Sequence, residues 1–117
     1  MLSSSIDAML GVYVMLPSCV PSTGLETSGA TLSSHDLSLL LNDERILGIA
    51  EVMNYPGVIY KDLDLLKKIA IANGKAIDGH APFLSGKDLY AYISSGIRSD
   101  HECSDINEAR EKLRAGM

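Results

Sequence analysis

Residues 45–53, which read RILGIAEVM, decide the fold class of this 117-residue chain. The segment is apolar on both faces of an extended chain, with Glu51 as the exception, and it is short enough to be a strand. Strands that are apolar on both faces are typical of parallel sheets covered by helices. The segment therefore predicts a buried parallel strand that carries one carboxylate.

Short apolar runs alternate with polar loops and amphipathic segments along the rest of the chain. Further strands are predicted at residues 11–16 (GVYVML), 76–78 and 97–99, and loops at 17–32 and 54–61. The strand starts near residues 12, 46, 76 and 97 lie 34, 30 and 21 residues apart, and the units of a TIM barrel average about 31 residues. The pattern predicts an α/β fold of four consecutive β/α units. These units fit a partial TIM (β/α) barrel or a small open sheet, and periodicity alone leaves both open.

The predicted helices begin at polar capping residues and end at glycines. The expected starts are Ser33 or Ser34, Asp62, Ser85 and about Ser104, and the expected stops include Gly74, Gly96 and Gly116. Helical spacing predicts that Leu37, Leu40 and Leu41 share one inner face, as do Leu89, Tyr92 and Ile93. Each helix can therefore cover the sheet with an apolar side.

Composition excludes several classes of partner. The net charge of -5 argues against nucleic acid, because phosphate binding needs clustered Lys and Arg. No apolar run approaches the roughly 18 residues of a membrane span, and residues 1–5 lack the basic start of a signal peptide. Cys19 and Cys103 form no metal or redox spacing, so a reduced, cytoplasmic protein is expected.

Glu51, His80 and His101 each lie at or just beyond the carboxyl end of a predicted strand. In parallel α/β folds this edge is where ligands bind, and two imidazoles with one carboxylate suit a divalent transition metal. A single loop histidine is more often a solvated or hydrogen-bonded residue. His35, at a helix start, is predicted to be solvated in this way. It is the convergence of three such residues that indicates a metal site.

Five motifs resemble the bacterial and archaeal adenine deaminase family, in order and in spacing. They are residues 12–21 (VYVMLPSCVP), 26–30 (ETSGA), 50–58 (AEVMNYPGV), 78–82 (DGHAP) and 99–103 (SDHEC). The resemblance covers essentially the whole chain. It implies an enzyme of the amidohydrolase superfamily, a distorted TIM barrel that hydrolyses adenine to hypoxanthine and ammonia in purine salvage. Iron or manganese, in a mono- or binuclear centre, is the implied cofactor.

The resemblance also implies roles for particular residues. Glu51 corresponds to the metal ligand after the fourth strand, bridging where two metals bind, and His80 and His101 to the ligands after the fifth and sixth strands. Asp100 and Glu102, which flank a ligand, are candidates for contacts to the ligands or to adenine. In the family's chemistry the metal activates water, and an Asp after the last strand carries the proton to the departing ammonia.

The chain departs from the family pattern in two places. The His-x-His pair that ends the family's first strand is absent from the 117 residues, and so is the segment with the proton-carrying Asp. Residues 1–117 are therefore expected to be an internal fragment of the catalytic barrel, from the third strand to the sixth helix. On its own this fragment is expected to be inactive, and one open possibility is that it holds no metal.

Two other functions are left open by the sequence. One is a non-catalytic half-barrel module that binds a partner or itself through its open edges. The other is a fragment of a different amidohydrolase that acts on a cyclic amide. A half-barrel exposes its inner strand face, for which Val12, Val14, Leu47, Ile49 and Ile97 are candidates, so a homo-oligomer is expected.

Overall fold

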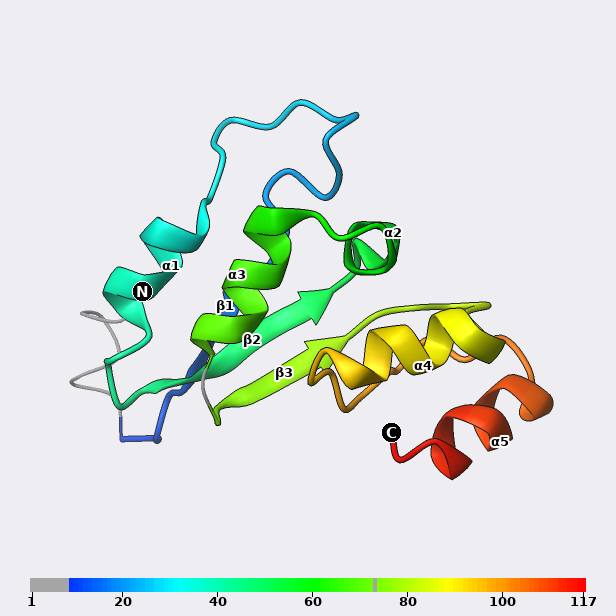
Figure 1. The fold of residues 1–117 in the computed structure, drawn as a ribbon. Helices are drawn as coiled ribbons and strands as arrows, with labels where there is room; N and C mark the ends of the chain where they lie inside the picture. Colours follow the sequence, from blue (N-terminus) through cyan, green and yellow to red (C-terminus); the bar gives the residue numbers. More distant parts are fainter. Residues whose placement is uncertain (1–8, 73) are drawn as a thin grey trace.

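A three-stranded parallel sheet forms the centre of the computed structural model, which describes residues 9–72 and 74–117. The strand order is β1 (Val14–Pro17), β2 (Ile46–Val52) and β3 (Ala76–Gly79), with β2 in the middle (Figure 1). The predicted α/β class and the parallel sheet are confirmed. Residues 1–5, for which no signal peptide is predicted, lie outside the described residues.

The helices of the described residues are α1 (Ser34–Leu40), α2 (Tyr55–Ile59), α3 (Leu63–Ile71), α4 (Gly86–Ser94) and α5 (Ile106–Arg114). Four of these five helices, all except α2, have their N-cap at or within one residue of the predicted capping positions. Ser33 forms a capping box with Asp36, and the Asp62 side chain accepts the Leu65 N–H at 3.0 Å. Gly74, Gly96 and Gly116 follow helix ends with positive φ, as expected of helix-stopping glycines. Ser85 precedes α4 but makes no side-chain cap.

The core lies between the sheet and the helices. α1 and α3 lie against one face of β1 and β2 (Figure 1), where Leu37 and Ile69 are buried with Ile46. At the carboxyl end of the sheet, α4 buries Leu89 and Tyr92 completely. A buried aliphatic or aromatic side chain of this size stabilises the fold by about 1.5–3 kcal/mol, so these contacts fix the strand ends that carry the polar residues.

The predicted fourth strand is wrong. Residues 97–99 run beside β3, where the Arg98 N–H bonds the Ile77 carbonyl at 3.4 Å, but they are not a strand. The Gly79 N–H bonds the Ser99 hydroxyl at 3.2 Å instead of a backbone carbonyl. A side chain therefore takes the place of the next backbone hydrogen bond, and the ladder stops there.

Three smaller predictions are also wrong. The loop predicted at 54–61 contains α2, because the Asn54 side chain caps the Gly57 N–H at 3.0 Å and Pro56 suits a first helical turn. Leu40 is exposed, since Leu37 and Leu41 already fill the contact with the sheet. Ile49 and Ile97, proposed for an exposed strand surface, are both 0% exposed and belong to the core.

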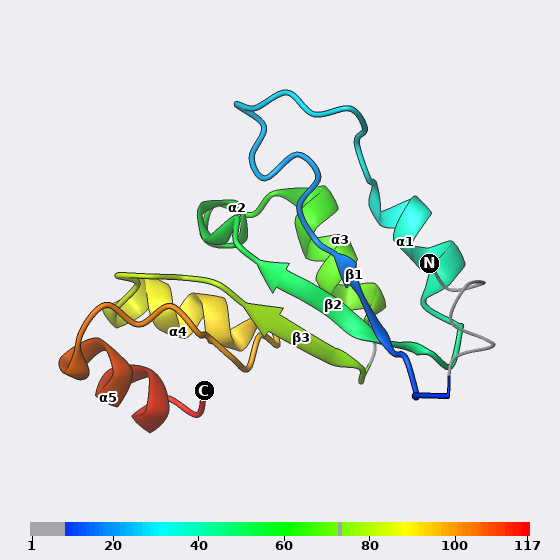
Figure 2. The ribbon, with the colours of Figure 1, turned by 180° about the vertical axis from the view of Figure 1, so that it is seen from behind.

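The second face of β1 and β2 carries no helix from the described part of the chain (Figure 2). Leu47 in β2 is 49% exposed, and Val12 and Tyr13 just before β1 are exposed as well. Cys19 and Cys103 are free thiols, of which Cys103 is exposed. Among residues 9–72 and 74–117, no helix has the length and apolar character needed to cross a membrane.

Replacing Gly79 with Ala is expected to lower the free energy of unfolding by about 1–3 kcal/mol, the usual cost of overpacking. A Cβ at this position would lie 2.2 Å from the Ser99 carbonyl oxygen and 2.9 Å from the Tyr92 hydroxyl. Urea unfolding followed by circular dichroism measures the change. Gly29→Ala is the matched control, because a Cβ there meets nothing within 4 Å. Equal stability of the two variants would contradict the close approach of residue 99 to β3.

Candidate metal site

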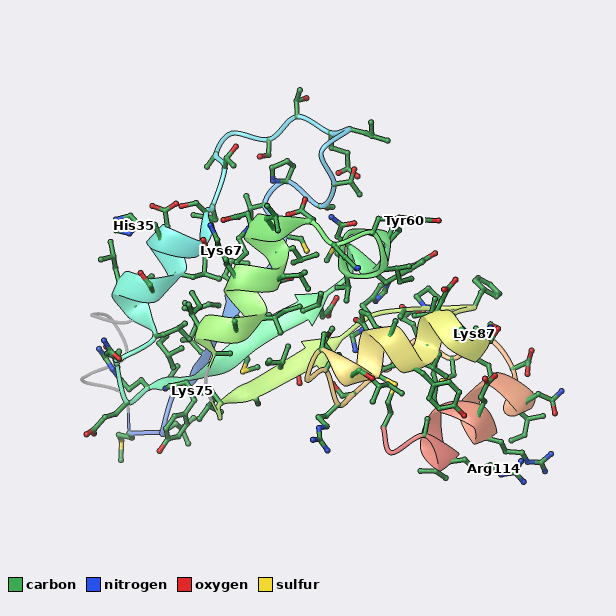
Figure 3. All side chains as sticks on the ribbon, in the orientation of Figure 1. His35, Tyr60, Lys67, Lys75, Lys87 and Arg114 are labelled. Carbon is green, nitrogen blue, oxygen red and sulfur yellow. The ribbon has the colours of Figure 1, made fainter. Side chains whose placement is uncertain are left out.

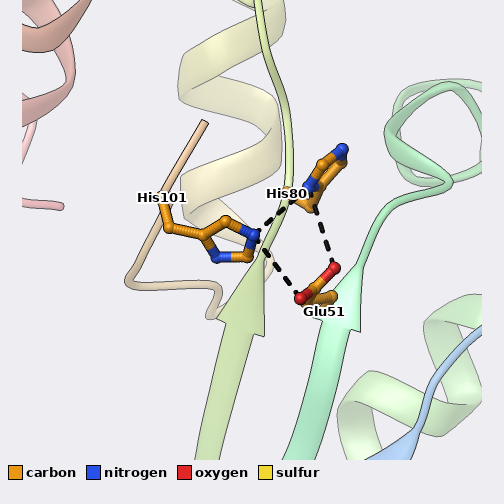
Figure 4. Close-up of side chains that lie close together, drawn as sticks. All are labelled: Glu51, His80 and His101. Carbon is orange, nitrogen blue, oxygen red and sulfur yellow. Dashed lines mark hydrogen bonds and ion pairs between the residues drawn. The ribbon is translucent and has the colours of Figure 1, made fainter. Parts of the chain in front are cut away.

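Glu51, His80 and His101 converge at the carboxyl edge of the sheet (Figure 4). The His101 Nε2 lies 3.4 Å from the Glu51 Oε1, and the His80 Nδ1 lies 3.7 Å from the Glu51 Oε2. The two imidazole nitrogens are 3.5 Å apart. The structure thus brings together the three residues that the sequence placed at strand ends, and their role as ligands stays a prediction.

The donor set and its spacing fit a divalent transition metal. Two ligands about 2.0–2.1 Å from a tetrahedral ion lie about 3.4 Å from each other. The two imidazole nitrogens are 3.5 Å apart, each lies 3.4 or 3.7 Å from a different oxygen of Glu51, and one donor atom from each residue lies within 4.8 Å of the others. Imidazole nitrogen with carboxylate oxygen suits manganese, iron or zinc better than calcium, which prefers oxygen alone. The side chains are partly exposed, at 29% for His80, 44% for Glu51 and 54% for His101, so an ion can reach them from solvent.

The register of the sheet explains why Glu51 and His80 meet. Val52 of β2 pairs with Gly79 of β3, so Glu51 comes one residue before this pair and His80 one residue after it. The Tyr92 hydroxyl joins the same two strands, because it donates to the Val52 carbonyl at 2.6 Å and accepts the His80 N–H at 3.0 Å. Burial of the Tyr92 side chain raises the pKa of its hydroxyl, which therefore stays protonated and keeps donating.

Asp100 and Glu102 take different positions beside His101. The Asp100 side chain is 1% exposed and forms an ion pair with Lys112, while its Oδ1 accepts the Glu102 N–H at 3.0 Å. Burial raises the pKa of the Asp100 carboxyl, but the bonds from Lys112 outweigh this effect and lower it overall. Glu102 is exposed. Asp100 is thus engaged with a lysine of α5, and contacts of either residue to adenine stay a prediction.

A buried ion-pair network adjoins the site. Lys112 of α5 binds both Asp100 and Glu108, and the three side chains are 3%, 1% and 7% exposed. Burial raises the pKa of the Glu108 carboxyl, but hydrogen bonds from Lys112, Ser104 and Phe83 outweigh it and lower this pKa to about 2. Burial lowers the pKa of the Lys112 ammonium group, but its two carboxylate partners, Asp100 and Glu108, outweigh this effect and raise the pKa overall. All three groups are therefore charged at neutral pH.

Sequence reasoning assigned Tyr92 only to the core and did not identify Lys112 or Glu108. The four-residue spacing of Glu108 and Lys112 on one helix was an available signal, because such pairs face each other. His35 lies on α1 and is exposed, as predicted (Figure 3).

Curated relatives that match the whole chain are named adenine deaminases, while no model of a protein family matches it. The chain is 52% identical to adenine deaminase 2 of Carboxydothermus hydrogenoformans, over 100% of this chain and 20% of the relative. It is 53% identical to the adenine deaminase of Dehalococcoides mccartyi, over 99% of this chain and 20% of the relative. It is 51% identical to the adenine deaminase of Methanoculleus marisnigri, over 100% of this chain and 22% of the relative. The resemblance found in the motifs is confirmed, and the chain spans about one fifth of the length of these relatives.

Proposed function

The whole chain is homologous to a segment that makes up about one fifth of the length of adenine deaminases. From this premise we propose that it supplies three metal ligands of such an enzyme. The ligands are Glu51, His80 and His101. The observation that carries the proposal is that their donor atoms all lie within 4.8 Å of one another at the carboxyl edge of a parallel sheet. In parallel β/α folds this edge is the place of ligand binding and catalysis.

The proposed reaction of the whole protein is the hydrolysis of adenine to hypoxanthine and ammonia. Manganese or iron held by these three residues would supply Lewis-acid activation of water. The parallel β/α arrangement supports a TIM barrel as the complete fold, in which residues 1–117 contribute consecutive units. The names of the relatives favour adenine over a cyclic amide as substrate, and a substrate panel on the full-length relatives distinguishes the two.

The residues of this chain would have different roles at the site, namely metal binding, positioning of the strand ends, and contact with the ligands or adenine. The Glu51 carboxylate would bring negative charge to the cation, and the two imidazoles would each offer it a ring nitrogen. Tyr92 holds the ends of β2 and β3 together through the Val52 carbonyl and the His80 N–H. Asp100 and Glu102 lie beside His101 and are proposed to contact the ligands or adenine in the complete enzyme.

Replacing Glu51 with Gln, or either ligand histidine with Ala, is expected to weaken Mn²⁺ binding by at least about tenfold. Loss of a group that merely supports a ligand already costs about 10–100-fold in affinity, and loss of the ligand itself costs no less. Isothermal titration of the 117-residue chain with MnCl₂ measures the dissociation constants. His35→Ala is the matched control, because His35 is an exposed histidine on α1. Wild-type affinity in all three ligand variants would refute the metal site.

A specific observation also supports the second candidate, a self-associating half-barrel module. One face of β1 and β2 carries no helix from the described residues, and Leu47 on β2 is 49% exposed. Apolar strand surface of this kind favours association with another chain. A homo-oligomer is compatible with both candidates, whereas metal binding at Glu51, His80 and His101 is required only by the first.

A further inference from the structure

We propose that Lys112 is a positioning residue that holds the two histidine-bearing loops at a fixed distance from each other. The inference rests on the proposed metal site, which it deepens by assigning the residue that sets the geometry of the site. Lys112 is on α5, and its side chain is 3% exposed.

The contacts of the Lys112 ammonium group adjoin both proposed histidine ligands in sequence. Its Nζ donates to the Ala81 carbonyl at 2.7 Å, and Ala81 directly follows His80. The same Nζ binds the Asp100 carboxylate, and Asp100 directly precedes His101. One buried cation thus joins the residue after one histidine to the residue before the other.

Glu108 extends this connection on the same side of α5. Its Oε1 accepts the Phe83 N–H at 2.9 Å, on the loop that follows His80, and it also binds Lys112. Its Oε2 accepts the Ser104 N–H at 2.9 Å, on the loop that follows His101. Lys112 and Glu108 lie one helical turn apart, and each of these two side chains bonds both loops.

His101 depends on this connection more than His80 does. β3 and the Tyr92 hydroxyl already hold the backbone at His80, through the Val52–Gly79 register and the His80 N–H. His101 lies in a segment without regular secondary structure, between α4 and α5. Because ion pairs and hydrogen bonds of buried groups are costly to break, Lys112 restricts where the loop can place the His101 ring.

The experiment compares Lys112→Met with Lys75→Met in the metal-free 117-residue chain. Lys75 is the matched control, because its Nζ also donates to backbone carbonyls, those of Asp43 and Ile46, at the opposite edge of the sheet. The readout is the nuclear Overhauser contact between the His80 and His101 ring protons, since the ring centroids are 5.4 Å apart. We expect the contact to be lost in Lys112→Met and kept in Lys75→Met. Mn²⁺ affinity should fall about tenfold in the first variant only.

Lys112→Met leaves two buried carboxylates without their cation and is therefore at risk of unfolding. The triple variant Asp100→Asn, Glu108→Gln and Lys112→Met removes all three charges, which is often tolerated by a fold. A folded triple variant that has lost the ring contact supports the proposal. Wild-type ring contact and Mn²⁺ affinity in either folded variant would overturn it.

Failure of the proposed metal site gives a different result. In that case Mn²⁺ binding is insensitive to Glu51→Gln, while the ring contact of the metal-free chain still reports whether Lys112 positions His101. The two hypotheses are thus decided by separate measurements on the same set of variants.

Discussion

The 117-residue chain should release ammonia from adenine at least about 10⁴-fold more slowly than a full-length adenine deaminase, which in practice means no signal above background. General acid–base catalysis alone contributes about 10²–10⁴-fold, and metal activation of water adds to it. The chain supplies three converging donors, Glu51, His80 and His101. The family resemblance implies two further ligands from a His-x-His pair, which these 117 residues do not contain, and an Asp after the family's last strand that carries the proton.

A coupled ammonia assay with added Mn²⁺ or ferrous iron tests this expectation. The positive control is full-length adenine deaminase 2 of Carboxydothermus hydrogenoformans, which is 52% identical to this chain over 117 residues. Comparable turnover by the short chain would show that its own residues provide the proton route and the missing ligands. The roles given to Glu51 and the histidines would then have to be reassigned.

The position of the candidate site could be predicted from the sequence because it follows from a general property of parallel sheets. The apolar run around Glu51 identifies a buried strand, and carboxyl ends of parallel strands meet at one edge. In the structure, Val52 of β2 pairs with Gly79 of β3, and this register brings Glu51 and His80 close together at the ends of neighbouring strands. His80 directly follows β3, whereas His101 lies in the longer segment between α4 and α5, for which the sequence gives no distance.

The residues that support the site could not be predicted from the sequence in the same way. Tyr92 and Lys112 come from helices, and helical periodicity predicts which face is buried but not which backbone groups that face meets. The Val52 carbonyl, bonded to the Tyr92 hydroxyl at 2.6 Å, lies 40 residues away in the chain. Lys112 reaches the Ala81 carbonyl across 31 residues. Such contacts depend on the packing of whole elements.

The errors in secondary structure have local physical causes. Residues 97–99 have the apolar start of a strand, and Ile97 is fully buried, but the Ser99 hydroxyl accepts the Gly79 N–H and ends the ladder. In residues 54–61 the Pro56-Gly57 pair indicates a turn, whereas the Asn54 cap allows a short helix. Both outcomes depend on single side-chain hydrogen bonds, which periodicity does not detect.

Self-association should weaken by about 10²-fold or more when Leu47 and Tyr13 are both replaced by Lys. Leu47 on β2 is 49% exposed, and Tyr13 next to β1 is 62% exposed. One face of β1 and β2 carries no helix from the described residues (Figure 2). In a symmetric dimer both chains contribute the same patch, so two copies of each side chain become buried. Burying one large apolar side chain is worth about 1.5–3 kcal/mol, and each 1.4 kcal/mol changes a dissociation constant about tenfold. Lysines on an open strand surface also oppose pairing with a second chain.

Light scattering after size exclusion, over a wide range of protein concentration, measures this change. We expect the wild-type chain to be dimeric or larger and the double variant to be shifted to the monomer. Leu63→Lys is the matched control, because Leu63 is 73% exposed at the start of α3, on the helix-covered side of the sheet. A wild-type chain that stays a sharp monomer at all concentrations would contradict association through the open strand face. The sheet would then be stable with that face in water, as antiparallel sheets commonly are and parallel sheets rarely are.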